Sequence, residues 1–269
     1  MTLSRATRVA LGVLGALLLA SLALPALVPW SPEQIDWSQV AVAPGTGGHW
    51  LGTDRLGRDL LVRTAAGVRI SMLIALAATL VSLVIGVGVG AVAGYAGGRT
   101  DAVLMRAVDV LYSLPYVFFV ILLTVVFGRQ PTTVFIAIGA VGWLTMARVV
   151  RGEARRLRGR EFIEAAIATG LPPLAILWRH VLPNLAGPVL VYATLTVPGM
   201  ILIESFLSFL GLGIQEPAAS LGNLLAAGAA EMESAPWLLL VPVSCLVAMV
   251  LALGILGEGL RDALDPHAG

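Results

Sequence analysis

The sequence predicts an all-α polytopic membrane protein with six transmembrane helices and both termini in the cytoplasm. Of its 269 residues, 58% are hydrophobic and only 12% are charged, and the mean hydropathy is +0.92. Soluble domains carry about 25% charged residues, so a surface this poor in charge must face lipid. Six stretches reach the roughly 20 mostly apolar residues that a membrane-spanning helix needs. They are residues 9–29, 71–95, 102–127, 133–150, 185–210 and 237–256.

Residues 1–29 are the first predicted element, an N-terminal anchor helix. Arg5 and Arg8 precede its apolar run, which is also the charge pattern of a signal peptide. The run exceeds the about 7–15 apolar residues of a signal peptide, and no convincing small-x-small cleavage site follows it. We therefore expect a retained helix, with a cleaved signal peptide as the alternative. Residues 30–70 are then a periplasmic loop, and residues 71–269 are a core domain with five further spans.

The distribution of arginine predicts the orientation, since all 17 basic residues are arginine and none is lysine. Cytoplasmic segments of membrane proteins carry the excess of positive charge. With the N-terminus inside, twelve arginines fall in inner segments and five in outer ones. The 30–70 loop holds four of those five, and four acidic residues balance them. Both termini are therefore expected in the cytoplasm. The acidic residues of the loop are Glu33, Asp36, Asp54 and Asp59.

The second span carries a stripe of small residues at Gly86, Gly90 and Gly94. Residues four apart lie on one face of a helix, and glycine there lets the backbone of a neighbouring helix approach closely. The same segment contains the sequence GVGVG, but it lacks the strand and turn that surround a nucleotide-binding glycine loop. The stripe therefore predicts a helix-packing face.

Three prolines and two acids interrupt the later spans. Pro115, Pro198 and Pro242 each leave a backbone carbonyl without its donor, so they predict bends. Asp109 and Glu204 are ionisable at membrane depth, where such groups are costly and usually face a cavity or a polar partner. Three roles stay open for both acids: lining a substrate path, binding an amine of the substrate, or pairing with an arginine of a partner chain.

The connection between the fourth and fifth spans, residues 151–184, has the composition of a water-facing helical hairpin. Its first part, RGEARRLRGREFIEAAIATG, is a good helix sequence, and Gly170 is suited to the left-handed residue that ends a helix. Pro172 or Pro173 can open a second helix, where a missing N–H costs nothing. The segment LAILWRHV supplies that second helix, and Pro183 is expected to stop it.

The first helix of the hairpin carries a small apolar ridge. Phe162 and Ile163 recur at Ala166 and Ile167, a spacing that places these side chains on one face of an otherwise charged helix. A short hairpin with an exposed ridge is not stable alone, so the ridge predicts docking into a groove of a partner chain. A connector lying on the lipid headgroups is the alternative that these residues leave open.

Residue types also exclude several chemical functions. A phosphate-binding loop needs a lysine and the chain has none, so ATP would have to bind another chain. Cys245 lies in an apolar run and is interpreted as a buried thiol. The histidines, His49, His180 and His267, show no metal-ligand spacing. The sequence therefore predicts no metal site, no catalytic group and no cofactor in this chain, and no binding of nucleic acid.

The hairpin contains a recognisable motif. EAAIATG followed after nine residues by HVLP resembles the EAA loop of ABC-importer permeases, EAA-x3-G-x9-I-x-LP, with His180 at the position of the isoleucine. The segments HWLGTDRLGRDLL, ESFLSFLGLGIQEP and GLRDALDP resemble the C-type permeases of peptide and nickel importers, and most closely their oligopeptide branch. The similarity covers nearly the whole chain, from SPEQIDW onward.

The resemblance implies the type I ABC importer permease fold, in the bacterial inner membrane. It implies import of oligopeptides, or alternatively of dipeptides or nickel. The implied partners are a second, B-type permease, two ATP-binding subunits that hold ATP and Mg, a periplasmic or lipid-anchored substrate-binding protein, and membrane lipid. Arg58 and Asp59 would contact the binding protein, or else form an internal pair. The implied coupling residues are Glu164, Ala165, Ala166, Gly170, His180, Leu182 and Pro183.

Two other function classes are disfavoured. A self-sufficient secondary carrier would show inverted repeats and broken helices at matching positions in two halves, and the sequence shows neither. An intramembrane enzyme would need a nucleophile with a base, or a histidine and aspartate metal cluster, at membrane depth. No such group is apparent in the sequence.

Overall fold

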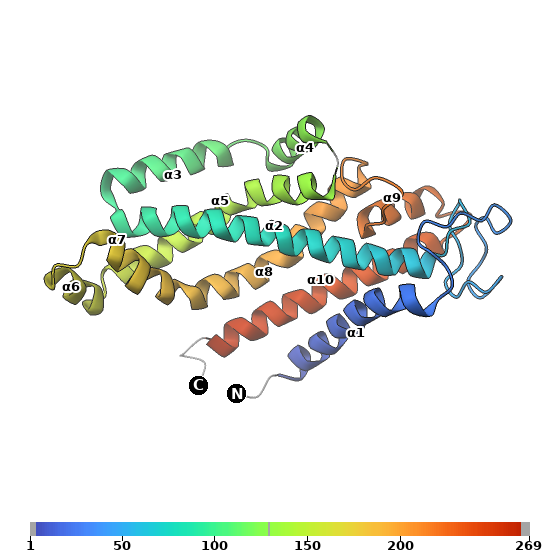
Figure 1. Ribbon diagram of the computed structural model, residues 1–269, viewed down its shortest axis with the longest axis horizontal. Coiled ribbons are helices and arrows are strands. Elements are labelled where there is room, and N and C mark those ends of the chain that lie inside the picture. Colours follow the sequence, from blue (N-terminus) through green and yellow to red (C-terminus); the bar gives the residue numbers. More distant parts are fainter. Residues whose placement is uncertain (1–3, 129, 265–269) are drawn as a thin grey trace.

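The computed structural model describes residues 4–128 and 130–264, and these form a bundle of long helices that lie side by side (Figure 1). Helix α1 (Arg5–Leu27) begins at Ser4, whose hydroxyl accepts a hydrogen bond from the Thr7 amide. A loop over residues 28–59 leads to α2 (Leu60–Ala96). This helix begins well before residue 71, the predicted start of the second span, because Asp59 caps it. The outer loop is therefore shorter than predicted.

The third predicted span, residues 102–127, bends at Pro115 as the sequence predicts, and the bend is sharp enough to divide the span into two helices. Helices α3 (Gly98–Tyr112) and α4 (Tyr116–Phe127) replace it, with a bend of 82° between them. We call residues 113–115 the elbow. Pro115 explains the break, because proline has no N–H to donate and disfavours the helical conformation at the residue before it.

Helix α5 (Pro131–Arg158) runs past the predicted end of the fourth span, residue 150. Among the described residues, five stretches are long and apolar enough to cross a membrane: α1, α2, α5, α10 and the continuous stretch Pro173–Phe209. The bent α3–α4 pair makes a sixth if it is counted as one span. Pro198 and Pro242 lie inside helices that continue past them. The remaining elements are α6 (Glu161–Ala168), α7 (Pro173–Ile176), the π-helical turn η1 (Leu177–Val181), α8 (Leu182–Phe209), α9 (Leu221–Ala230) and α10 (Trp237–Leu264).

Helices α2 and α5 form the centre of the bundle, and the glycine stripe of α2 lies against α5. A Cβ atom at Gly86 would lie 2.6 Å from the Cβ of Met146, and one at Gly90 would lie 2.5 Å from the Ala147 carbonyl oxygen. At Gly94 the backbone of α5 is equally close. No residue larger than glycine fits such distances without displacing a neighbour, so the stripe sets the spacing of the two helices.

The bundle has two distinct ends (Figure 1). One end carries the hairpin of α6 and α7, and α1 begins and α10 ends toward it. The opposite end carries the 28–59 loop and α9. A cluster of buried residues joins the hairpin to the bundle, with Ile163 of α6, Ile176 of α7 and Leu185 of α8 packed beside Val150 of α5. The hairpin is therefore part of the folded core.

Candidate functional site

The hairpin turns at Gly170. This residue has a φ of +79°, the left-handed conformation that the sequence predicts. Its amide donates to the Ile167 carbonyl at 2.9 Å, and the Leu171 amide donates to the Ala166 carbonyl at 3.3 Å, which satisfies carbonyls that the helix end leaves free. The predicted single helix before this turn was wrong. Helix α5 ends at Gly159, a residue with low helix propensity, and α6 is a separate helix.

The apolar ridge of α6 is divided between two environments. Ile163 is fully buried and Ala166 nearly so, both against the bundle. Phe162 and Ile167 are 40% and 55% exposed and flank that buried strip on either side. The prediction that all four residues share one exposed face was therefore wrong. Glu164 and Ala165 are exposed. They therefore lie on the outward face of the helix, opposite the buried strip.

The second helix of the hairpin does not stop at Pro183, which corrects the sequence prediction. The Leu182 amide donates to the Leu177 carbonyl, five residues earlier, and this bond forms the π-helical turn η1. A widened turn accommodates the proline ring, which a regular helix would press against the Arg179 carbonyl. The chain therefore passes from the hairpin into α8 without a break. His180 and Leu182 are half-buried, and Pro183 is exposed.

Three cavities follow α5 and α8 from the elbow toward the hairpin. The first, of about 420 Å³, lies between the elbow, α3, α4 and α5. The second, of about 310 Å³, lies between α5 and α8 and shares Gly142 and Thr145 with the first. The third, of about 520 Å³, shares Tyr192 and Leu195 with the second and reaches Arg261 of α10. Shared walls make the three cavities one series along the bundle.

Asp109 lies beside this series and is paired within its own chain. Its Oδ1 atom is 2.8 Å from Nη2 of Arg148 on α5. The Arg148 guanidinium also lies 4.0 Å from the centre of the Tyr112 ring, a cation–π contact. A second pair joins the same two helices nearer the hairpin, where Arg151 donates to both carboxylate oxygens of Asp101 at 2.5 and 2.6 Å.

Glu204 is fully buried at a junction of three helices. Its carboxylate accepts hydrogen bonds from Ser71 of α2 at 2.7 Å and from Ser208 of α8 at 2.8 Å. Both hydroxyls also accept from backbone amides at 3.1 Å, Ser71 from Leu221 of α9 and Ser208 from Ile214. One carboxylate therefore joins α2, α8, α9 and the loop before α9.

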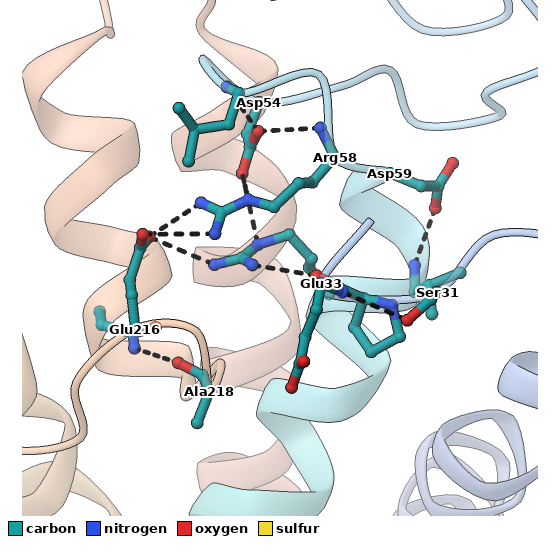
Figure 2. A network of polar contacts seen from close by, with 12 residues as sticks. Ser31, Glu33, Asp54, Arg58, Asp59, Glu216 and Ala218 are labelled. Carbon is teal, nitrogen blue, oxygen red and sulfur yellow. Dashed lines mark hydrogen bonds and ion pairs between the residues drawn. The ribbon is translucent and has the colours of Figure 1, made fainter. Parts of the chain in front are cut away.

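A network of charged side chains lies at the end of the molecule opposite the hairpin. Figure 2 shows Asp54 and Glu216 on either side of Arg58, at 2.7 and 2.8 Å from its guanidinium. Arg63 of α2 lies 3.4 Å from Asp54 and 3.5 Å from Glu216. The hydrogen bond from Arg58 holds the pKa of the Glu216 carboxyl below its usual value, although burial opposes the shift. The network ties the 28–59 loop to the segment between α8 and α9.

Arg58 and Asp59 are both buried and both engaged within the chain, but not with each other. Asp59 lies 2.7 Å from Nδ1 of His49, and the His49 ring packs against Trp30 with a centroid separation of 4.4 Å. Asp59 also caps α2. Each of the two residues therefore has other partners within the chain, and the internal pair of Arg58 with Asp59 that the sequence left open is not formed.

Sequence reasoning missed the arginine partners on α5. Arg148 and Arg151 entered the prediction only as charges that set the orientation. A usable signal was present, because Asp101 and Asp109 are eight residues apart and therefore lie on one face of a helix. Two acids on one face predict two basic partners on a neighbouring helix. Within residues 4–128 and 130–264, no group of three or more histidine, cysteine, aspartate or glutamate residues could hold a metal ion.

Comparison with known proteins identifies close relatives. The chain is 51% identical to the oligopeptide transport system permease protein OppC of Haemophilus influenzae, over 90% of this chain and 78% of that protein. It is 49% identical to OppC of Escherichia coli K12, over 98% of this chain and 87% of that protein. The dipeptide transport system permease protein DppC of Bacillus subtilis is 45% identical to it, over 83% of this chain and 70% of that protein.

The fold has solved counterparts. A chain of the MetNI methionine ABC transporter, in an inward-facing conformation, superposes with a TM-score of 0.60 at 21% identity, covering 77% of this chain and 96% of that one. The likeness concerns the fold alone. Residues 86–269 match the family described as the inner membrane component of binding-protein-dependent transport systems. This chain, a multi-pass protein of the inner membrane, therefore belongs to that family of transport-system components.

Proposed function

We propose that this chain is a transmembrane subunit of an ATP-driven ABC importer and forms half of the translocation path for oligopeptides. The observation that carries the proposal is the identity of 51% and 49% to two oligopeptide permeases, over 90% and 98% of the chain. The series of cavities along α5 and α8 supports it, since a homologous B-type permease placed against these helices would enclose the series as a path.

The hairpin is the element that couples this subunit to ATP. Its buried strip holds it to α5 through Ile163, so a force on the hairpin reaches the spans. Its outward face presents Glu164 and Ala165, with Phe162 and Ile167 on the flanks, to a groove on an ATP-binding subunit. ATP and Mg bind in those partner subunits, because this chain has no lysine for a phosphate loop.

The hairpin face of the membrane is the cytoplasmic face in this proposal, as the excess of arginine there requires. The 28–59 loop and α9 then face the periplasm, where a substrate-binding protein delivers the peptide. Dipeptide import is the second candidate, favoured by the 45% identity to a dipeptide permease of Bacillus subtilis.

Transport by the reconstituted complex tests the proposal. The chain is combined in proteoliposomes with its second permease, the two ATP-binding subunits and the binding protein, and uptake of a labelled oligopeptide is measured with and without ATP. We expect uptake that requires ATP and every subunit, and that an excess of unlabelled dipeptide leaves unchanged. Uptake that needs no other chain would overturn the importer assignment. Competition by dipeptide would instead favour the second candidate.

A further inference from the structure

Two ion pairs of unequal strength hold α3 to α5. Asp101 and Arg151 form a bidentate pair whose side chains are 13% and 33% exposed. Asp109 and Arg148 share a single hydrogen bond, and their side chains are 59% and 39% exposed. Bidentate pairs are the stronger ones, and exposed pairs are weakened by water and salt. The end of α3 near the hairpin is therefore held more firmly than the end near the elbow.

The weaker pair contacts the wall of the first cavity through Tyr112. Tyr112 of α3 and Leu144 and Thr145 of α5 line that cavity. On α5, Arg148 lies one turn beyond Leu144 and Thr145 toward the hairpin, and its guanidinium covers the ring of Tyr112. Asp109 meets it from α3. Tyr112 therefore connects the pair to the wall of the cavity, on the side that faces the hairpin.

The rest of α3 offers little resistance to movement. It buries two side chains, Met105 and Val108, and ends at the bent elbow. Because buried apolar area is the main source of packing stability, a helix with so little of it can separate from α5 at its elbow end once the Asp109–Arg148 pair breaks. The firm pair of Asp101 and Arg151 remains as the point about which α3 turns.

We propose that Asp109 and Arg148, braced by Tyr112, form a latch that holds the elbow end of α3 against α5 and closes the first cavity toward the hairpin. The latch opens when a movement of the hairpin draws α5 away from α3. Its consequence for transport depends on the proposed function, since the opened side leads a peptide toward the second and third cavities. The geometry of the latch itself does not depend on the substrate.

Thiol labelling of the assembled complex measures the latch directly. Cys245 is the only cysteine of the chain, so Cys245→Ala gives a background in which Ala140→Cys, at a residue that lines the first cavity and not the second, reports on the first cavity. The reagent is N-ethylmaleimide, which is uncharged, so a changed local charge does not alter its approach. Asp109→Arg and Arg148→Asp should each speed labelling about three- to fivefold, the shift expected from loss of one partly exposed ion pair.

The double reversal, Asp109→Arg with Arg148→Asp, should return the labelling rate toward that of the unaltered pair, because the two charges attract again. Arg106→Gln is the matched control: it removes a charge from an exposed position of α3 and should leave the rate unchanged. Single reversals that leave the rate unchanged would overturn the proposal, as would a double reversal that labels as fast as either single one.

A covalent latch provides a second test if the reversals fail to assemble. Asp109→Cys and Arg148→Cys are combined in the Cys245→Ala background and joined by a short bifunctional methanethiosulfonate, which forms a disulfide with each thiol. The joined complex should lose peptide uptake and regain it after reduction. Uptake that continues with the two residues joined would show that the latch does not open in transport. Absence of uptake in the wild-type complex would instead refute the proposed function and leave the labelling result intact.

Discussion

Gly170 sets the direction of the hairpin through its backbone. Its φ is +79°, yet a Cβ atom built there would meet no heavy atom within 4 Å. Conformation, and not space, therefore limits the residue at this position. Gly170→Val should destabilise the hairpin by about 1–2 kcal/mol, the cost of the left-handed conformation for a residue with a β-carbon.

Asparagine adopts that conformation more readily than other residues, so Gly170→Asn is the matched control. Uptake and ATPase activity of the assembled complex should both fall with valine and be largely retained with asparagine. Equal loss with the two side chains would show that the backbone conformation is not the reason for glycine at this position.

Glu164 tests whether the outward face of α6 contacts a partner. The residue is exposed on α6, so Glu164→Arg should leave membrane abundance unchanged. It should lower recovery of the ATP-binding subunits in a pull-down, because the charge facing their groove is reversed. The same change at Glu233, exposed after α9 at the other end of the molecule, is the control. If Glu164→Arg recovers as much ATP-binding subunit as wild type, α6 is a plain connector.

Helix packing at the scale of α2 can be tested with two glycines of the same helix. Leucine at Gly90 would place its Cβ atom 2.5 Å from the Ala147 carbonyl oxygen and 2.8 Å from the Val150 Cβ atom. Gly90→Leu should therefore destabilise the purified chain by about 1–3 kcal/mol or more, as overpacking does. A Cβ atom at Gly88 would meet no atom outside its own helix backbone within 4 Å, so the Gly88→Leu variant should unfold near the wild-type temperature. A similar loss of stability at both positions would show that the flexibility of the helix, and not the contact with α5, is the reason for glycine at Gly90.

The elements show which features of the fold a single sequence carries. Apolar length located the five long helical stretches and the bent α3–α4 pair, and the small-residue stripe of Gly86, Gly90 and Gly94 located the face of α2 that meets α5. Local signals failed where tertiary contacts decide the outcome. The π-helical turn carries the chain past Pro183, and the buried face of α6 is chosen by α5, on residues that the sequence presents only as an amphipathic pattern.

In the candidate site, too, the sequence predicts some features and not others. A motif identified the hairpin, because its residues are contiguous in sequence. The partners of Asp109, Glu204 and Glu216 on other elements lie 39, 133 and 158 residues away, and they become visible only when the helices are placed. Pairings of this kind depend on which helices are neighbours, and hydropathy does not determine that.

The molecule as a whole should respond to acid through its outer end. The pKa of Glu216 is held below its ordinary value of 4.5 by the hydrogen bond from Arg58. A carboxyl with a depressed pKa stabilises the fold above its unfolded pKa, and this contribution is lost as the pH falls through the folded pKa. The loss therefore occurs below about pH 4.5. Glu216 is 44% exposed, so the contribution is at most about 1 kcal/mol.

Thermal unfolding at neutral pH and near pH 3.5 measures this contribution. Glu216→Gln should lower the unfolding temperature at neutral pH. Near pH 3.5 the unfolding temperatures of this variant and of wild type should lie closer together. Glu233→Gln, at an exposed position, should follow the wild-type curve at both values. A difference between wild type and Glu216→Gln that stays constant with pH would exclude a role for the charge of Glu216.

The unbroken stretch from Pro173 to Phe209 has a mechanical consequence. At 1.5 Å per residue its 37 residues measure about 55 Å, so one rod joins the hairpin to the junction around Glu204. The far end of this rod is tied to α2, because Ser71 of α2 donates a hydrogen bond to Glu204. Pro188 and Pro198 lie inside the rod and are the positions where it can bend. A push on the hairpin is therefore expected to be felt at the opposite end of the bundle, less whatever the two prolines absorb.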